Sequence, residues 1–127
     1  MSLTFAEFRR ANVLRSVETF KRNPKGNRNM VAFALGMGEE TGEALGAVRG
    51  FTGITKRKKG KISRSDIGHE VADSFFYGDL VVACAELLTE DVLQEKYNKT
   101  SERSGSPYRL KGGKLYRLDG RGKLRRA

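Results

Sequence analysis

Residues 38–50, GEETGEALGAVRG, and residues 66–87, DIGHEVADSFFYGDLVVACAEL, determine the predicted fold. Each stretch places two acids three residues apart among Ala, Val, Gly and Phe residues. The first pair is Glu40 and Glu43, and the second is Glu70 and Asp73. Residues three apart share one face of an α-helix, with Cβ atoms about 5–6 Å apart. Two such helices that face each other would bring four carboxylates to one point.

Four carboxylates at one point require protons or a cation, because like charges repel and resist desolvation. All the donors are oxygens, with no histidine or thiolate among them, and this selects Mg²⁺, with Mn²⁺ as the alternative, over zinc. The predicted metal ligands are Glu40, Glu43, Glu70 and Asp73. Glu39 is offset by about 100° on the helix. It is expected either to bind a second ion or to act as general base toward a water.

The bulk composition predicts a cytoplasmic protein. The 127 residues suffice for one packed core and are too few for two. No stretch reaches the about 18–20 uncharged apolar residues of a membrane span, and the N-terminus lacks the apolar segment of a secretory signal. A single cysteine and a single histidine exclude an intramolecular disulfide and argue against a Cys/His zinc site.

The net charge of +10 is concentrated in two segments. One is the loop 56–64, KRKKGKISR, between the two acidic stretches. The other is the C-terminal segment from Arg103 onward, where nine Lys or Arg residues, Arg103 included, accompany one acid, Asp119. Such fields attract polyanions, whether the phosphates of a nucleotide or those of a nucleic acid. The alternative for both segments is a solvated, solubilising surface.

Hydrophobic spacing and capping residues predict four helices, at about residues 4–22, 29–49, 67–88 and 90–103. The expected N-caps are Thr4 for the first helix, Ser65 or Asp66 for the third and Thr89 for the fourth. The third helix is apolar around most of its circumference, which places it centrally or at an oligomer interface. Four glycines in the second helix each lower its stability by roughly 1 kcal/mol. Their presence is explained if another helix packs very close to the face that carries them; they are Gly36, Gly38, Gly42 and Gly46.

After residues 104–107, SGSP, the composition changes. Gly112-Gly113 separates YRLK from KLYRL, which favours a small β-hairpin over a disordered basic tail. The fold class is therefore predicted as all-α, a four-helix bundle with a short basic C-terminal tail or hairpin. The predicted domains are a helical domain, residues 1–104, and a basic extension, residues 105–127.

The combination of Glu-Glu-x-x-Glu, a spacer and Glu-x-x-Asp resembles the signature of the MazG-like all-α nucleoside triphosphate pyrophosphohydrolases. Residues 38–50 are similar to the second helix of that family, residues 66–87 to the third and VLQEKYNKTSERSG, residues 92–105, to the fourth. The resemblance covers roughly residues 28–104. It implies a catalytic helical bundle, at least dimeric, that cleaves a (deoxy)nucleoside triphosphate to monophosphate and pyrophosphate.

The resemblance also implies roles for single residues. The four acids of the two pairs are the Mg²⁺ ligands, and Glu39 helps to activate water. Lys96 matches a lysine that contacts substrate. Thr100 stands where the family has an asparagine; its hydroxyl can form hydrogen bonds, but it lacks the paired donor and acceptor of an amide. Recognition of the base or sugar is therefore where this chain departs from the family.

Other residues receive roles by their position. At most two cations of the loop between the acidic helices are expected to clamp the β and γ phosphates. Lys58 and Lys59 are the named candidates, and Lys56, Arg57 and Lys61 are the alternatives. Tyr77 is either a structural residue or a contact for the base, and Asp79 is expected to be a cap or a salt-bridge partner. His69 and Cys84 are expected to be structural.

Two other functions remain open. The first is a small basic nucleic-acid-binding protein that grips phosphates with loop 56–64 and the tail, either instead of catalysis or in addition to it. The second is an inactive scaffold, against which the intact acidic set argues. The apolar third helix and the family resemblance both predict a homodimer or homotetramer.

Overall fold

The structure is a computed structural model that describes residues 1–55 and 61–127. It divides into two compact units, residues 1–86 and 87–127. The first unit contains the helices α1 (Phe5–Glu18), α2 (Gly26–Phe51) and α3 (Arg64–Cys84). The second contains α4 (Thr89–Ser104) and the strands β1 (Tyr108–Lys111), β2 (Lys114–Leu118) and β3 (Leu124–Arg126).

The helix α1 is shorter than the predicted helix 4–22. Thr4 caps it as expected, because its hydroxyl accepts a hydrogen bond from the Glu7 N–H at 3.2 Å. The helix ends at Glu18, and Lys21 takes a left-handed conformation with φ of 54°. The Ser16 hydroxyl donates to the Arg22 carbonyl at 2.6 Å and so secures the turn that leads away from the helix.

The helix α3 begins and ends earlier than predicted. Its N-cap is Ser63, not Ser65 or Asp66; Asp66 is the third helical residue and completes a capping box with Ser63. A carboxylate at that position satisfies the N-cap N–H, which is why Asp66 lies inside the helix. The chain leaves the helix after Cys84, and Glu86 has a positive φ of 60°.

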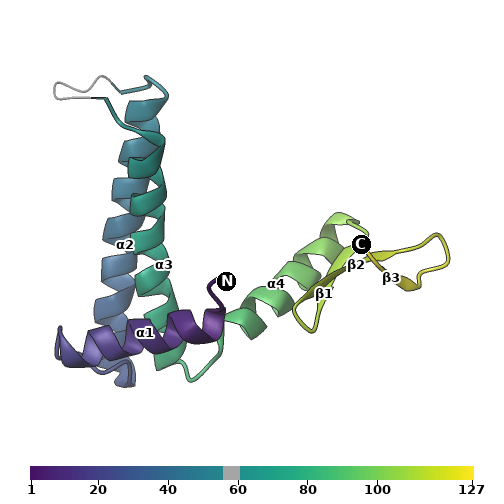
Figure 1. Ribbon diagram of the computed structural model, residues 1–127, viewed down its shortest axis with the longest axis horizontal. Coiled ribbons are helices and arrows are strands. Elements are labelled where there is room, and N and C mark those ends of the chain that lie inside the picture. The colour runs from purple at the N-terminus through teal and green to yellow at the C-terminus, as the bar shows by residue number, and fades with distance from the viewer. Residues whose placement is uncertain (56–60) are drawn as a thin grey trace. The chain divides into compact units, whose positions relative to one another are not determined.

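The helices α2 and α3 run antiparallel side by side, and α1 lies across the end where α2 begins and α3 ends (Figure 1). Phe33 of α2 packs on Leu80 and Cys84 of α3 to form the buried core. At Gly36 a Cβ atom would lie 2.6 Å from the Tyr77 ring, so this position requires glycine. At the other three glycines predicted to be packed closely, Gly38, Gly42 and Gly46, a Cβ would meet no described atom within 4 Å apart from the helix's own nearby backbone. The predicted close packing of a helix inside the unit is therefore correct only for Gly36.

A buried ion pair fastens α1 to α3. The Nε atom of Arg9 lies 2.8 Å from the Asp79 carboxylate, whose side chain is 1% exposed. Asn12 donates to the Phe76 carbonyl at 2.8 Å and to Asp79 at 3.2 Å. The predicted salt-bridge role of Asp79 is confirmed, and α1 is the element that it holds.

In the second unit, α4 starts at Thr89, so Leu88 and not Thr89 occupies the N-cap position. The predicted hairpin is confirmed: β1 and β2 pair antiparallel through Gly112 and Gly113, both with positive φ. The strand β3, which sequence reasoning missed, pairs with β2 to give the order β1-β2-β3. The sequence signal for the turn before β3 is Asp119-Gly120, a pair typical of turns. In the structure the Asp119 carboxylate accepts hydrogen bonds from the N–H groups of Arg121 and Lys123.

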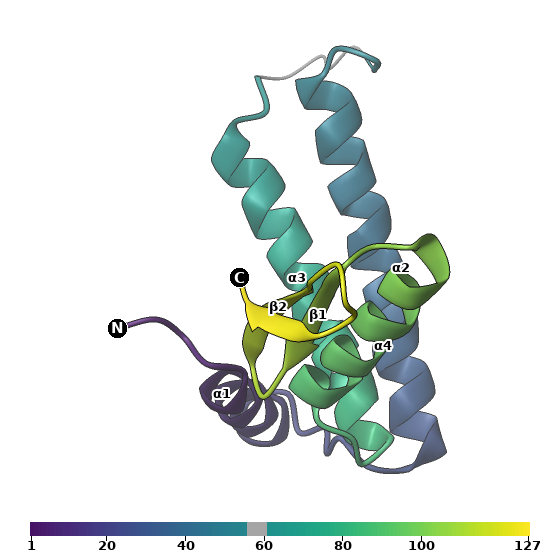
Figure 2. The ribbon, with the colours of Figure 1, turned by 90° about the vertical axis from the view of Figure 1, so that its right-hand side faces the viewer.

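The helix α4 lies beside β1 (Figure 2). The side chain of Asn98 joins it to the open edge of this strand. Its amide donates to the Leu110 carbonyl and accepts from the Leu110 N–H, both at 2.8 Å. Because this edge has no strand partner in the sheet, the asparagine supplies the hydrogen bonds that a fourth strand would have made.

The described fold is mostly helical, with four helices and one small three-stranded sheet. The packing of α4 with the other helices in one four-helix bundle stays a prediction. None of the helices in the described residues is both long enough and apolar enough to span a lipid bilayer.

Candidate functional site

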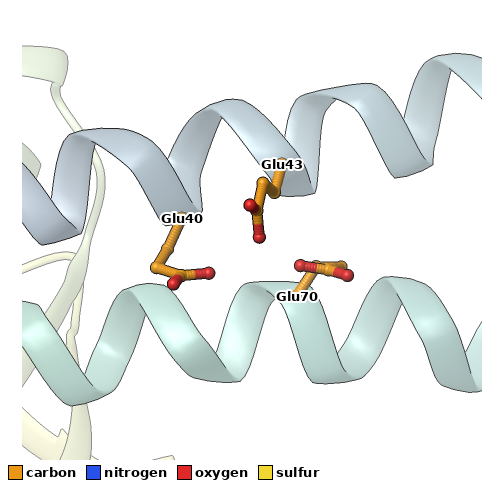
Figure 3. A group of neighbouring side chains, drawn as sticks. All are labelled: Glu40, Glu43 and Glu70. Atoms are coloured by element: carbon orange, nitrogen blue, oxygen red, sulfur yellow. The ribbon is translucent and has the colours of Figure 1, made fainter.

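Three of the predicted ligands meet between α2 and α3. Glu40 and Glu43 point from α2 toward α3, and Glu70 points back from α3 (Figure 3). One carboxylate oxygen of each residue lies within 4.8 Å of the other two. Glu40 and Glu70 are half-buried and Glu43 is exposed, so the group is accessible from solvent.

The fourth predicted ligand, Asp73, is not part of this closest group. Its negative charge nevertheless acts on Glu40, as do those of Glu43 and Glu39. Partial burial raises the pKa of Glu40, and its hydrogen bond with Glu43 and the repulsion from these three acids raise it further. The register of α2 against α3 thus places Glu40 at the electrostatic centre of the cluster.

The donor set fits a hard divalent cation. The carboxylates of Glu40, Glu43 and Glu70 lie within 4.8 Å of one another, so their negative charges repel. A divalent ion would balance this charge, with oxygen ligands from both helices. Glu40, Glu43 and Glu70 are therefore the residues that could hold Mg²⁺ or Mn²⁺, and the charge of Asp73 acts on the same group through Glu40.

A cavity of about 830 Å³ adjoins the acidic cluster. Its walls come from α1, α2, α3 and the segment between α1 and α2. Besides small, polar and aliphatic residues, three kinds of side chain line it: the acids Glu39, Glu40 and Asp73, the cations Arg15 and Arg22, and the aromatics Phe20, Phe33, Phe76 and Tyr77. One cavity thus presents an acidic edge, positive charge and flat apolar rings.

Sequence reasoning missed the two arginines. Arg15 lies in the last turn of α1, where a cation is expected merely because it complements the helix dipole. In the structure its guanidinium stands 4.5 Å from the centre of the Phe76 ring and borders the cavity. Arg22 reaches the cavity from the turn after α1.

For the other predicted substrate residues, Lys58, Lys59, Lys96 and Thr100, the role at the site stays a prediction. Lys58 and Lys59 lie outside the described residues. Lys96 and Thr100 are exposed on α4, in the second unit, and their contact with substrate stays a prediction.

Cys84 and His69, both expected to be structural, differ in how far they are buried. Cys84 is a buried core residue, as predicted, and burial raises the pKa of its thiol, which disfavours the reactive thiolate. His69 is exposed on α3. The ring of Tyr77 packs on Gly36, which fits the predicted structural role, and it also lines the cavity; its contact with a base stays a prediction.

Comparison with protein-family models, with curated proteins and with solved structures finds no match to this chain. The resemblance to the MazG-like family therefore rests on the acidic motifs of the sequence and stays a prediction.

Proposed function

We propose that the protein is a Mg²⁺-dependent nucleotide pyrophosphohydrolase that cleaves a (deoxy)nucleoside triphosphate to monophosphate and pyrophosphate. One observation carries the proposal: Glu40, Glu43 and Glu70 converge from two helices within 4.8 Å, and Glu40 also lines the adjoining cavity. A metal held there faces the space in which a substrate would bind.

In this proposal Glu40, Glu43 and Glu70 hold the metal, and Asp73 supports it. Bound Mg²⁺ supplies polarisation of a phosphoryl oxygen and lowers the pKa of a bound water. Glu39, exposed at the cavity, accepts the proton of the attacking water. The water oxygen bonds to one of the two bridged phosphorus atoms, the α–β anhydride bond breaks, and the leaving phosphate takes the electron pair.

The other walls of the cavity suit the rest of a nucleotide. Arg15 and Arg22 can donate several hydrogen bonds to phosphate oxygens, which favours a triphosphate over an uncharged ligand. The rings of Phe20, Phe76 and Tyr77 offer flat apolar surface to a base. We therefore expect Arg15→Gln to raise the KM for triphosphates more than it lowers kcat, because it removes charge that substrate contacts before any bond changes.

The deciding assay measures pyrophosphate released from a panel of ribo- and deoxyribonucleoside triphosphates, with Mg²⁺, with Mn²⁺ and with EDTA. Turnover is expected only with a metal, with monophosphate and pyrophosphate as the products. Glu43→Gln and Asp73→Asn should abolish it, while Glu18→Gln, the same change on the exposed last residue of α1, should not. Absence of turnover for every triphosphate, or activity retained in Glu43→Gln, would refute the proposal.

We also propose that the first unit forms a homodimer or homotetramer. Val31, Leu35 and Leu45 are each more than half exposed on α2. Their spacing places them on one helix face together with Gly38 and Gly42, where a second copy of the chain could approach closely. Sedimentation should show a dimer or tetramer that Leu35→Glu/Leu45→Glu dissociates, and a wild-type monomer at micromolar concentration would contradict the proposal.

A further inference from the structure

The small sheet of the second unit carries arginine and tyrosine side chains in rows across its strands. The strand register places Tyr108 of β1 opposite Arg117 of β2, which is opposite Arg125 of β3. Residues directly opposite in an antiparallel pair lie on the same face of the sheet. One face therefore presents a row of one tyrosine and two arginines, here called the Tyr-Arg-Arg row.

The Tyr-Arg-Arg row contains an unfavourable pair of charges. Arg117 and Arg125 are direct cross-strand neighbours, and like charges in that arrangement destabilise a sheet. On the opposite face the register brings Lys111 against Lys114 as well. A sheet of three short strands with two such pairs tolerates repulsion that an anionic ligand would relieve.

The single acid of the C-terminal residues neutralises only part of the positive charge on the sheet. Residues 105–127 contain eight Lys or Arg residues and a single acid, Asp119. Asp119 accepts from two backbone N–H groups and lies 3.1 Å from the Nε atom of Arg125. The Arg125 side chain is still 64% exposed after making this contact. The net charge of the row therefore remains positive and open to solvent.

The aromatic member of the row is open to a ligand too. Tyr108 is 40% exposed, and the Arg117 guanidinium stands 6.0 Å from the centre of its ring, at the outer limit of a cation–π contact. Proteins that recognise single-stranded nucleic acid combine two elements: cations that bind its phosphates and aromatic rings on which its bases stack. A duplex keeps its base faces stacked inside, so it could use the arginines but not the ring.

We propose that the Tyr-Arg-Arg row binds single-stranded nucleic acid, with phosphates on Arg117 and Arg125 and a base on Tyr108. The inference goes beyond the proposed hydrolase function and does not depend on it, because the row belongs to the second unit and involves none of the acids of the first.

The test is binding of a short fluorescently labelled single-stranded DNA to the full chain, measured by anisotropy in EDTA over a range of salt concentrations. Each phosphate contact contributes about 0.7 to the slope of log K against log salt for single strands. Arg117→Gln/Arg125→Gln should therefore lower the slope by about 1.4 and weaken binding about 25-fold at about 0.1 M salt. Arg117→Lys/Arg125→Lys keeps both charges and should retain the slope, which separates loss of contacts from loss of folding.

The matched control is Arg10→Gln/Arg49→Gln, which removes the same charge from exposed positions of the first unit. This variant should bind nearly as the wild type does. Equal weakening by the control would show that net charge alone attracts the strand, and would overturn the proposal. So would the absence of binding, tighter binding of a duplex of the same length, or preferential binding of phosphatidylserine vesicles through the same arginines.

Discussion

Glu40→Gln is expected to have opposite effects on stability without metal and with it. The substitution keeps the shape of the side chain and removes one charge from a group whose oxygens lie within 4.8 Å of one another. Two unit charges at that distance repel by about 0.9 kcal/mol in bulk water and by about 3.5 kcal/mol at the dielectric constant typical of a protein surface. Because Glu43 is exposed and salt screens the group, the lower end applies, about 1–2 kcal/mol for both neighbours together.

The metal-free Glu40→Gln protein should therefore be the more stable one. At about 4 °C per kcal/mol for a unit of this size, its Tm should lie about 4–8 °C above that of the wild type in EDTA. Mg²⁺ at about a hundred times its Kd should stabilise the wild type by about 2.7 kcal/mol and the variant hardly at all. Thermal melting followed by far-ultraviolet circular dichroism measures both effects.

The pH dependence supplies a second check on the same variant. The pKa of Glu40 is raised in the folded state, so the folded protein binds a proton more readily than the unfolded chain does. As the pH falls through that raised pKa, the metal-free wild type gains stability and the advantage of Glu40→Gln should disappear. Addition of Mg²⁺ should oppose this protonation, since metal and proton compete for the same carboxylate.

Glu18→Gln is the matched control, because it removes the same charge from an exposed residue at the end of α1. It should change the metal-free stability by only a fraction of a kcal/mol and leave the response to Mg²⁺ intact. The reasoning fails if Glu40→Gln melts below the wild type in EDTA, or if the variant keeps the full stabilisation by Mg²⁺.

Three further predictions concern the framework of the two units. Gly36→Ala should destabilise the first unit by about 1–3 kcal/mol, since the added methyl would lie 2.6 Å from the Tyr77 ring. Gly68→Ala has open space around it and should stabilise α3 by about 0.5–1 kcal/mol. Denaturant unfolding compares the two variants, and equal effects on the free energy of unfolding would contradict the packing at Gly36. Asp79→Ala should cost about 3–5 kcal/mol in the same measurement, because it removes the buried carboxylate that pairs with the partly buried guanidinium of Arg9. A loss under about 1 kcal/mol would mean that α1 is held by other contacts. The N–H groups of Lys123 and Arg121 and the guanidinium of Arg125 hold the pKa of Asp119 below its usual range. The loop between β2 and β3 should therefore stay intact above the pKa of the unfolded chain and loosen as the pH falls through the lowered pKa of the folded protein. An NMR titration should show this loosening in the amide shifts of Arg121 and Lys123, and these shifts should not titrate in Asp119→Asn.

Much of the local structure could be predicted from the sequence. The spacing of three residues between Glu40 and Glu43 fixes one helix face, and Gly112-Gly113 fixes the turn of the hairpin. Both are properties of neighbouring residues, so they need no knowledge of the rest of the chain. Helix ends were less accurate, because Ser63, Ser65 and Asp66 are all competent caps and tertiary context selects among them.

The composition of the cavity could not be predicted in this way. Arg15 and Arg22 come from α1 and the turn after it, far from the acids in sequence, and nothing in their neighbours marks them. Their position depends on Asp79 and Asn12, which dock α1 onto α3. Local patterns carry no information about which helix docks on which.

The sequence by itself determined that two helices carry acids at metal-ligand spacing and that the C-terminal residues are basic and able to form a hairpin. Only the tertiary structure decided that Glu70 joins Glu40 and Glu43 while Asp73 lies beside them, and that arginines and aromatic rings complete the cavity. It also decided that Arg117 and Arg125 stand side by side. The physical reason is that helical spacing is set by hydrogen bonds along the chain, whereas the register between helices and between strands is set by packing among residues distant in sequence.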